Sequence, residues 1–118
     1  MPRTVLVVDD SAAFRATARV LLSARGYEVI GVAEDAASGI EAARTLQPDC
    51  VVLDVNLPDG DGVSVATTMT ANGGPAVVLV STLDASALGD GVERSGARGF
   101  VPKSELASPR LVELLGPP

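Results

Sequence analysis

The sequence predicts an α/β protein built on a five-stranded, doubly wound parallel sheet with helices on both faces and the strand order 2-1-3-4-5. Short continuous apolar runs alternate along the chain with stretches of helical periodicity. Runs that are apolar on both faces are typical of strands covered on both sides, as in a parallel sheet. Five β-α repeats within 118 residues favour this open sheet, because right-handed crossovers place helices on either face.

Five short segments are predicted to be strands, at residues 5–8, 29–32, 51–53, 77–80 and 99–102. The first, third and fourth are continuous runs rich in β-branched residues, which strands favour. The second and fifth are weaker. Because Pro102 would remove a donor from the ladder, the fifth strand belongs at an edge of the sheet.

Helical periodicity and end signals occupy the intervals between the strands, at residues 12–25, 36–46, 63–71, 85–95 and 108–115. Ser11 is the predicted N-cap of the first helix, and Ser108-Pro109 is a cap followed by proline at the first helical position. The fourth helix contains Gly89 and Gly91, each of which disfavours a helix by roughly 1 kcal/mol relative to alanine. We therefore expect that helix to be short or mobile.

Composition bounds the kind of protein and its partners. With 47% hydrophobic residues the chain can build a core, and we expect one domain over residues 1–116 with residues 117–118 as a tail or the start of a linker. The formal net charge of −6 would repel a nucleic-acid backbone or an anionic membrane. The longest apolar runs are too short to span a bilayer. We therefore expect no nucleic-acid or membrane partner for this chain.

The counts of cysteine and histidine exclude several chemistries. Cys50 is the only cysteine, so an intramolecular disulfide is excluded, a reducing compartment is expected and the cytoplasm is the predicted location. It precedes an apolar strand and is predicted to be a small buried hydrophobe. The chain has no histidine, which excludes a Ser-His-Asp triad, a Cys-His pair and any His-ligated metal.

Polar side chains follow four of the predicted strands, namely Asp9-Asp10, Asp54, Ser81-Thr82 and Lys103. Ligands of open α/β sheets bind beyond the carboxyl ends of the strands, at the point where the strand order reverses. In the order 2-1-3-4-5 that point lies between the first and third strands. We therefore expect the three aspartates to converge there.

The chemistry of this set points to phosphoryl transfer. Three neighbouring carboxylates repel one another, and Mg²⁺, which prefers carboxylate and phosphate oxygens, would relieve that repulsion. Lys103 supplies a point positive charge, and Ser81 supplies a hydroxyl donor. A carboxylate nucleophile, a metal, a cation and a hydroxyl are the parts needed to hold and transfer a phosphoryl group.

With these residues the chain resembles the receiver domain of bacterial two-component response regulators, the CheY-like family with a flavodoxin-like fold, over essentially its whole length. The matching pieces are Asp9-Asp10, Asp54, the Leu-Pro-Asp-Gly-Asp-Gly loop at residues 57–62, Ser81-Thr82, Phe100 and Lys103. Residues 27–70 and the Phe-Val-Pro-Lys segment look most like receivers of the NarL/LuxR type. The resemblance implies that residues 1–116 are a receiver domain.

The resemblance also implies a role for each site residue. Asp54 would be the phosphoacceptor, taking phosphate from the phosphohistidine of a sensor histidine kinase. The side chains of Asp10 and Asp54 and the main-chain carbonyl of Asn56 would hold Mg²⁺, with Asp9 acting through a water. Lys103 would pair with Asp54 and then with the phosphate.

Three further residues would form the switch. Ser81 would hydrogen-bond the phosphoryl group, and Phe100 would turn inward, changing the surface formed by the fourth helix, the fifth strand and the fifth helix. Thr82 is larger than the alanine or glycine often found there, and would slow phosphoryl transfer and hydrolysis. The implied function is a phosphoacceptor switch that catalyses only its own phosphorylation and dephosphorylation. Its output would be a downstream protein or a covalently linked domain.

Other functions stay open at this stage. The chain could be the receiver part of a longer NarL/LuxR-type DNA-binding regulator, or a pseudo-receiver that acts without phosphorylation. A Mg²⁺ phosphatase of the aspartate-nucleophile type needs Asp-x-Asp, which Asp54-Val55-Asn56 lacks. Within the loop, Asp59 and Asp61 are predicted to be solvated turn residues rather than metal ligands.

Overall fold

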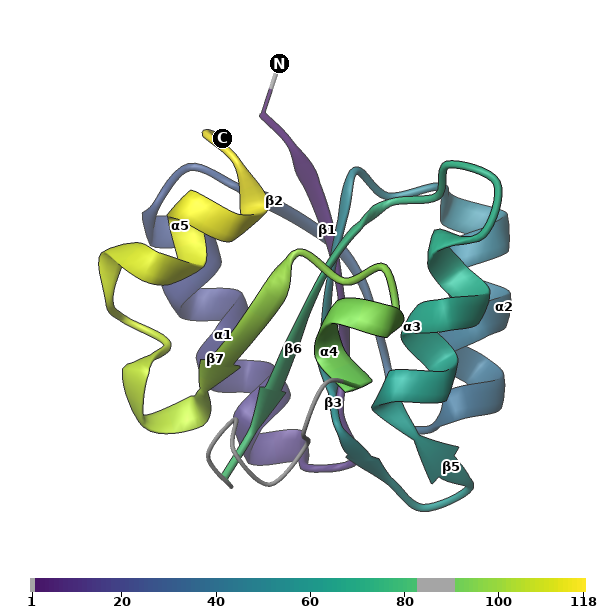
Figure 1. The fold of residues 1–118 in the computed structure, drawn as a ribbon. Coiled ribbons are helices and arrows are strands. Elements are labelled where there is room, and N and C mark those ends of the chain that lie inside the picture. Colours follow the sequence, from purple (N-terminus) through teal and green to yellow (C-terminus); the bar gives the residue numbers. More distant parts are fainter. Residues whose placement is uncertain (1, 83–90) are drawn as a thin grey trace.

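The sheet contains five parallel strands in the order β2-β1-β3-β6-β7, which confirms the predicted fold (Figure 1). The structure is a computed structural model and describes residues 2–82 and 91–118. The strands are β1 (Thr4–Val8), β2 (Glu28–Ala33), β3 (Cys50–Asp54), β6 (Ala76–Ser81) and β7 (Gly99–Pro102). As predicted, the strand that contains Pro102 is at an edge.

A small antiparallel hairpin leaves the end of β3. It consists of β4 (Asn56–Leu57) and β5 (Gly60–Asp61), with Asn56 paired with Asp61 and Leu57 with Gly60. The hairpin lies beyond the carboxyl ends of the parallel strands, beside the start of the next helix (Figure 1).

Helices cover both faces of the sheet, with α1 (Ala12–Ala24) and α5 (Pro109–Leu115) on one face (Figure 1). The other face carries α2 (Ala36–Leu46), α3 (Gly62–Thr70) and the short α4 (Gly91–Arg94). The predicted fourth helix began at residue 85, and residues 85–90 lie outside the described residues. Within residues 2–82 and 91–118, no helix is long and apolar enough to cross a membrane.

Burial on both faces explains why the strands are continuously apolar. In β1, Val5 and Val7 pack into the core beneath α1 and α5, whereas Leu6 and Val8 pack into the core beneath α2 and α3. All four side chains are fully buried, and so is Cys50, as predicted. Successive strand residues point to opposite faces, so a sheet covered on both sides needs apolar residues at every position.

Local signals fix the ends of the helices. The Ser11 hydroxyl accepts a hydrogen bond from the Phe14 N–H, so Ser11 caps α1 as predicted. Gly26, with a φ of 98°, follows the end of that helix in the left-handed region that glycine tolerates. Ser108 precedes Pro109 at the start of α5, but its side chain makes no capping hydrogen bond.

The turn after α1 also holds both ends of α5. The Arg25 guanidinium donates to the carbonyls of Ala107 and Ser108, just before α5 begins. The Tyr27 hydroxyl donates to the carbonyl of Gly116, at the end of that helix.

Candidate functional site

Three carboxylates converge at the carboxyl ends of β1 and β3. Asp9 and Asp10 directly follow β1, and Asp54 is the last residue of β3. One carboxylate oxygen from each lies within 4.8 Å of the other two. Asp9 and Asp54 are buried, whereas Asp10 is exposed. The structure thus brings together the three aspartates that the strand order predicts to meet.

Strand register explains this convergence. Val8 pairs with Leu53 between β1 and β3, so the residues that follow, Asp9 and Asp54, come out side by side. The Asp9 N–H also donates to the Ala33 carbonyl at 3.0 Å, which continues the pairing with β2 beyond the end of β1. The sheet itself therefore fixes the main chain that carries these carboxylates.

A glycine lets the next helix start against this end of the sheet. A Cβ at Gly62 would collide with the main-chain oxygen of Asp54 and lie 2.7 Å from the Cα of Val55. The Gly62 N–H donates to the Val55 carbonyl at 2.6 Å. A larger residue at position 62 would push the loop away from the end of β3.

Asp9 is held firmly on two sides. Its Oδ1 accepts a hydrogen bond from the Ser11 N–H at 2.8 Å, and its carbonyl accepts one from Arg15 at 2.6 Å. Its Oδ2 is buried and lies 2.7 Å from the Nζ of Lys103. The side chain is fully buried, so Lys103 provides the positive charge that this carboxylate needs.

Lys103 lies between two of the carboxylates. Its Nζ is 2.7 Å from Asp9 and 3.7 Å from Asp54, and 4.3 Å from the centre of the Phe14 ring. Lys103 was expected to pair with Asp54. The ammonium lies closer to Asp9, whose fixed, fully buried carboxylate is the one most in need of a counter-charge.

The environment of Asp54 disfavours its ionised form. Burial raises the pKa of Asp54, and the nearby Asp9 carboxylate raises it further. A hydrogen bond from the Asn56 N–H, at 3.3 Å, and the charge of Lys103 oppose this shift without cancelling it. The charge of Lys103 is therefore insufficient to restore the ordinary pKa of Asp54.

The donor set fits a hard divalent cation. Carboxylate oxygens from three residues are close enough to share an ion, and within the described residues the buried Asp9 Oδ2 contacts the Lys103 ammonium but has no further hydrogen-bond partner. Mg²⁺ takes oxygen ligands and typically one or two carboxylates. A cation here would offset the repulsion that raises the pKa of Asp54.

Ser81 and Phe100 lie on the two strands beside this cluster. Ser81 ends β6 and is buried, and its register partner on β7 is Pro102, next to Lys103. Thr82 follows and is exposed. Phe100, opposite Leu79, is only 6% exposed and packs inward in the core beneath α2 and α3. Ser81 therefore follows Val80, the register partner of Asp54, whereas Phe100 lies two residues before the end of β7.

Sequence comparison identifies the family. Residues 5–115 match the family model described as the response regulator receiver domain. The chain belongs to this family.

Relatives of known name contain the receiver domain as one part. The chain is 42% identical over 119 residues to a protein-glutamate methylesterase/protein-glutamine glutaminase of Myxococcus xanthus, covering 98% of this chain and 34% of that enzyme. It is 39% identical over 106 residues to the virulence-factor transcription regulator BvgA of Bordetella pertussis, covering 89% and 51%. The chain thus spans about a third to a half of the length of these relatives, and it matches only the receiver part of the methylesterase.

Solved structures of receiver domains superpose closely. The response regulator domain of Thermotoga maritima CheB has a TM-score of 0.85 and 27% identity, covering 98% of this chain and 94% of that chain. The signal receiver domain of a NarL response regulator from Mycobacterium tuberculosis has a TM-score of 0.84 and 30% identity, covering 98% of both chains.

Sequence reasoning missed the structural roles of two acidic residues in the receiver's β3–α3 loop. Asp61 and Asp59 are exposed, as predicted, but each also accepts hydrogen bonds at the start of a helix. Asp61 caps α3 by accepting from the Ser64 N–H at 2.8 Å, and its position just before a helix could have revealed this. Asp59 accepts hydrogen bonds from Ala36 and Ala37 at the start of α2, a contact across 22 and 23 residues that no local signal predicts.

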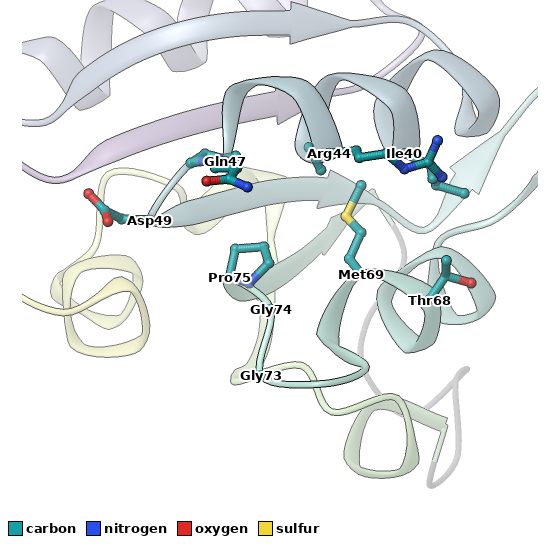
Figure 2. A pocket seen from close by; sticks show the side chains of 11 residues that line it. Ile40, Arg44, Gln47, Asp49, Thr68, Met69, Gly73, Gly74 and Pro75 are labelled. Atoms are coloured by element: carbon teal, nitrogen blue, oxygen red, sulfur yellow. The ribbon is translucent and has the colours of Figure 1, made fainter.

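A separate groove of about 530 Å³ lies between α2 and α3 (Figure 2). Its lining includes Ile40, Arg44 and Met69 from the helices and the 73–75 loop that precedes β6. Asp49, directly before β3, lies at its rim. The groove is therefore at the amino ends of the strands, opposite the aspartate cluster, and plays no part in the site described above.

Proposed function

We propose that this receiver domain is a phosphoacceptor switch of a two-component system, in which Asp54 takes a phosphoryl group from a sensor histidine kinase. One observation carries the proposal. The only lysine of the chain lies within ion-pair distance of Asp9 and Asp54, in a cluster of three carboxylates. Burial and the nearby Asp9 raise the pKa of Asp54, and a titratable group perturbed in this way is typical of a functional site.

Asp54 is the proposed nucleophile because it ends β3, the central strand of the sheet, within the carboxylate cluster. A carboxylate oxygen of Asp54 forms a bond to phosphorus as the bond between phosphorus and the kinase's histidine nitrogen breaks, and that bond's electron pair goes to the imidazole. The chain has no histidine of its own, which fits a phosphodonor on another protein. The product is an aspartyl phosphate, a covalent intermediate on a carboxylate.

The proposed Mg²⁺ ligands are the side chains of Asp10 and Asp54 and the main-chain carbonyl of Asn56, with Asp9 acting through a water. When bound, the ion supplies positive charge that offsets the repulsion between the carboxylates and the incoming phosphoryl oxygens. Asp9 and its hydrogen bond from Ser11 hold the neighbouring main chain in place.

Lys103 and Ser81 are proposed to hold the transferred group. The ammonium, now shared between Asp9 and Asp54, would contact a phosphoryl oxygen, and the Ser81 hydroxyl would donate to another. The new contacts favour one of two pre-existing arrangements of the surface formed by α4, β7 and α5, with Phe100 packed inward. Thr82, exposed at the end of β6, would narrow access and slow both transfer and hydrolysis.

The output of the switch is proposed to be a change in contact with a downstream protein or a covalently linked domain. Apart from its own phosphorylation and dephosphorylation, the receiver would catalyse nothing. We propose that it acts in the cytoplasm without binding nucleic acid or membrane itself, consistent with its net charge of −6.

A second candidate is that the chain is the receiver part of a longer NarL/LuxR-type DNA-binding regulator. The similarity to BvgA and to a NarL receiver favours it. The gene sequence downstream of the Pro118 codon decides it: a helix-turn-helix there supports this candidate, and a stop codon refutes it.

The phosphoacceptor proposal is tested with a small acyl phosphate as donor. Wild-type protein with Mg²⁺ is expected to gain the mass of one phosphoryl group, and Asp54→Asn is expected to gain none. Asp61→Asn is the matched control, because Asp61 is an acidic residue of the same loop and is expected to leave labelling intact. Wild type that stays unmodified would support a pseudo-receiver, and rapid turnover of a generic phosphate ester would support a phosphatase.

A further inference from the structure

We propose that Asp59 is a positioning residue that fastens the β4–β5 hairpin to α2 and thereby strengthens Mg²⁺ binding at the aspartate cluster. The inference rests on the proposed function, because the hairpin carries Asn56, whose main-chain carbonyl is a proposed ligand. It assigns a role to a side chain that touches neither the phosphoacceptor nor the other carboxylates of the cluster.

The contact joins the tip of the hairpin to the first turn of α2. Asp59 Oδ1 accepts from the Ala36 N–H at 2.6 Å, and Oδ2 accepts from the Ala37 N–H at 3.1 Å. These N–H groups belong to the first two residues of the helix, where no intrahelical partner exists. The two hydrogen bonds lower the pKa of Asp59, so the carboxylate stays ionised and bonded well below neutral pH.

Apart from this contact, the tip of the hairpin is exposed to solvent. Five of the hairpin's six residues are exposed, and only Leu57 is partly buried against the core. At its base, the Gly62 N–H donates to the Val55 carbonyl. A segment with few buried contacts opens easily, so a second attachment at the tip has a large effect on its motion.

The hairpin connects the Asp59 contact to the proposed metal site through Asn56. Asn56 lies on β4, two residues after Asp54, and its N–H donates to Asp54 Oδ1 at 3.3 Å. A hairpin fixed at both base and tip keeps Asn56 in one place before the ion arrives. Ordering a ligand in advance reduces the entropy that is lost when the ion binds.

α2 does not depend on Asp59 for its own cap. Asp35 accepts from the Ser38 N–H at 2.8 Å and forms a capping box with that residue. Asp35→Ala therefore weakens the start of α2 from the helix side without touching the hairpin. It is a matched control for Asp59→Ala, since both variants remove a carboxylate from the same helix terminus.

Mg²⁺ binding to the purified chain is measured by calorimetric titration. Asp59→Ala is expected to raise the dissociation constant roughly three- to tenfold, somewhat below the 10–100-fold effect of losing a residue that contacts a ligand directly. Asp59→Asn keeps an acceptor oxygen and is expected to recover part of the affinity. Asp35→Ala is expected to bind Mg²⁺ as wild type does, even though its melting temperature falls.

Hydrogen exchange of the metal-free protein gives a second measurement. The amides of residues 56–62 are expected to exchange faster in Asp59→Ala than in Asp35→Ala or wild type. Unchanged affinity in Asp59→Ala, or an equal loss in Asp35→Ala, would overturn the inference while leaving the proposed function intact. A wild type that binds no Mg²⁺ would overturn the proposed function, and the exchange rates would still show whether Asp59 holds the hairpin.

Discussion

The two ends of the parallel sheet use aspartate in opposite ways. At the amino end, Asp49 accepts hydrogen bonds from the Thr4 N–H at 2.9 Å and the Thr4 hydroxyl at 3.2 Å, and these bonds lower its pKa. At the carboxyl end, burial and the neighbouring Asp9 raise the pKa of Asp54. The ionised form of an aspartate is thus favoured at the amino end of the sheet and disfavoured at the carboxyl end. A fold keeps such an unfavourable cluster where function requires it.

The largest expected effect comes from removing the cation at the carboxyl end. Lys103→Ala leaves the fully buried Asp9 without its ion-pair partner. Breaking a buried pair in this way typically costs about 3 kcal/mol, so the free energy of unfolding in metal-free buffer is expected to fall by that order. Urea denaturation measures it, with the exposed Arg110→Ala as control.

Mg²⁺ is expected to recover part of the stability lost in Lys103→Ala, because the ion supplies the missing positive charge. An unfolding midpoint for Lys103→Ala equal to that of wild type in metal-free buffer would show that the carboxylates do not depend on this lysine.

A smaller loss is expected at the amino end. Asp49→Ala removes the acceptor for both Thr4 donors and is expected to lower the free energy of unfolding by about 1 kcal/mol. Labelling by acyl phosphate should be unchanged, since Asp49 lies at the opposite end of the sheet from Asp54. Reduced labelling at a temperature where the variant is folded would contradict the separation of the two ends.

Asp54→Asn is expected to stabilise the fold, whereas the two preceding substitutions destabilise it. Replacing the carboxylate by an amide of similar shape removes its repulsion with Asp9, so the melting temperature of the metal-free protein should rise by a few degrees at pH 7. Mg²⁺ should stabilise the wild type but not this variant. A lower melting temperature for Asp54→Asn would refute the idea that the cluster strains the fold.

The smallest expected effect concerns pH: the contributions of Asp54 and Asp49 to the stability of the fold should change differently as the solution is acidified. The folded-state pKa of Asp54 is raised, so its destabilising effect is full at neutral pH, declines as pH falls through that raised value and vanishes below the unfolded value. The stability gap between Asp54→Asn and wild type should therefore narrow as the solution is acidified.

The difference in stability between wild type and Asp49→Ala should depend on pH in another way. The folded-state pKa of Asp49 is lowered, so its stabilising contribution is present above the unfolded value and is lost only as pH falls through the lowered value. Thermal melts of the three proteins across the acid range compare the two responses directly. Parallel curves for both variants would contradict the opposite pKa shifts.

Features with a local or periodic cause could be predicted from the sequence. Strands such as 5–8 were recognisable because burial on both faces requires apolar residues throughout, and Ser11 was recognisable as a cap because the residue it bonds is three positions away. The meeting of Asp9, Asp10 and Asp54 followed from strand order, since parallel strands end at one edge. The roles assigned to Ser81, Thr82 and Phe100 stay predictions.

Contacts between distant segments could not be predicted. The bonds from Asp59 to α2 depend on how the hairpin folds over the neighbouring helix, which no sequence period encodes. The closer approach of Lys103 to Asp9 than to Asp54 likewise depends on distances between side chains from strands far apart in the sequence. Strand order indicates which residues are neighbours, whereas side-chain packing decides which of them pair.

The site of phosphoryl attachment is the most direct test of the account. After labelling with acyl phosphate and Mg²⁺, borohydride reduces an aspartyl phosphate to homoserine with loss of phosphate, and peptide mass spectrometry then locates the altered residue. The account predicts homoserine at position 54 alone, and none when Mg²⁺ is withheld. Homoserine at position 9 or 10, or its absence from the whole chain, would contradict it.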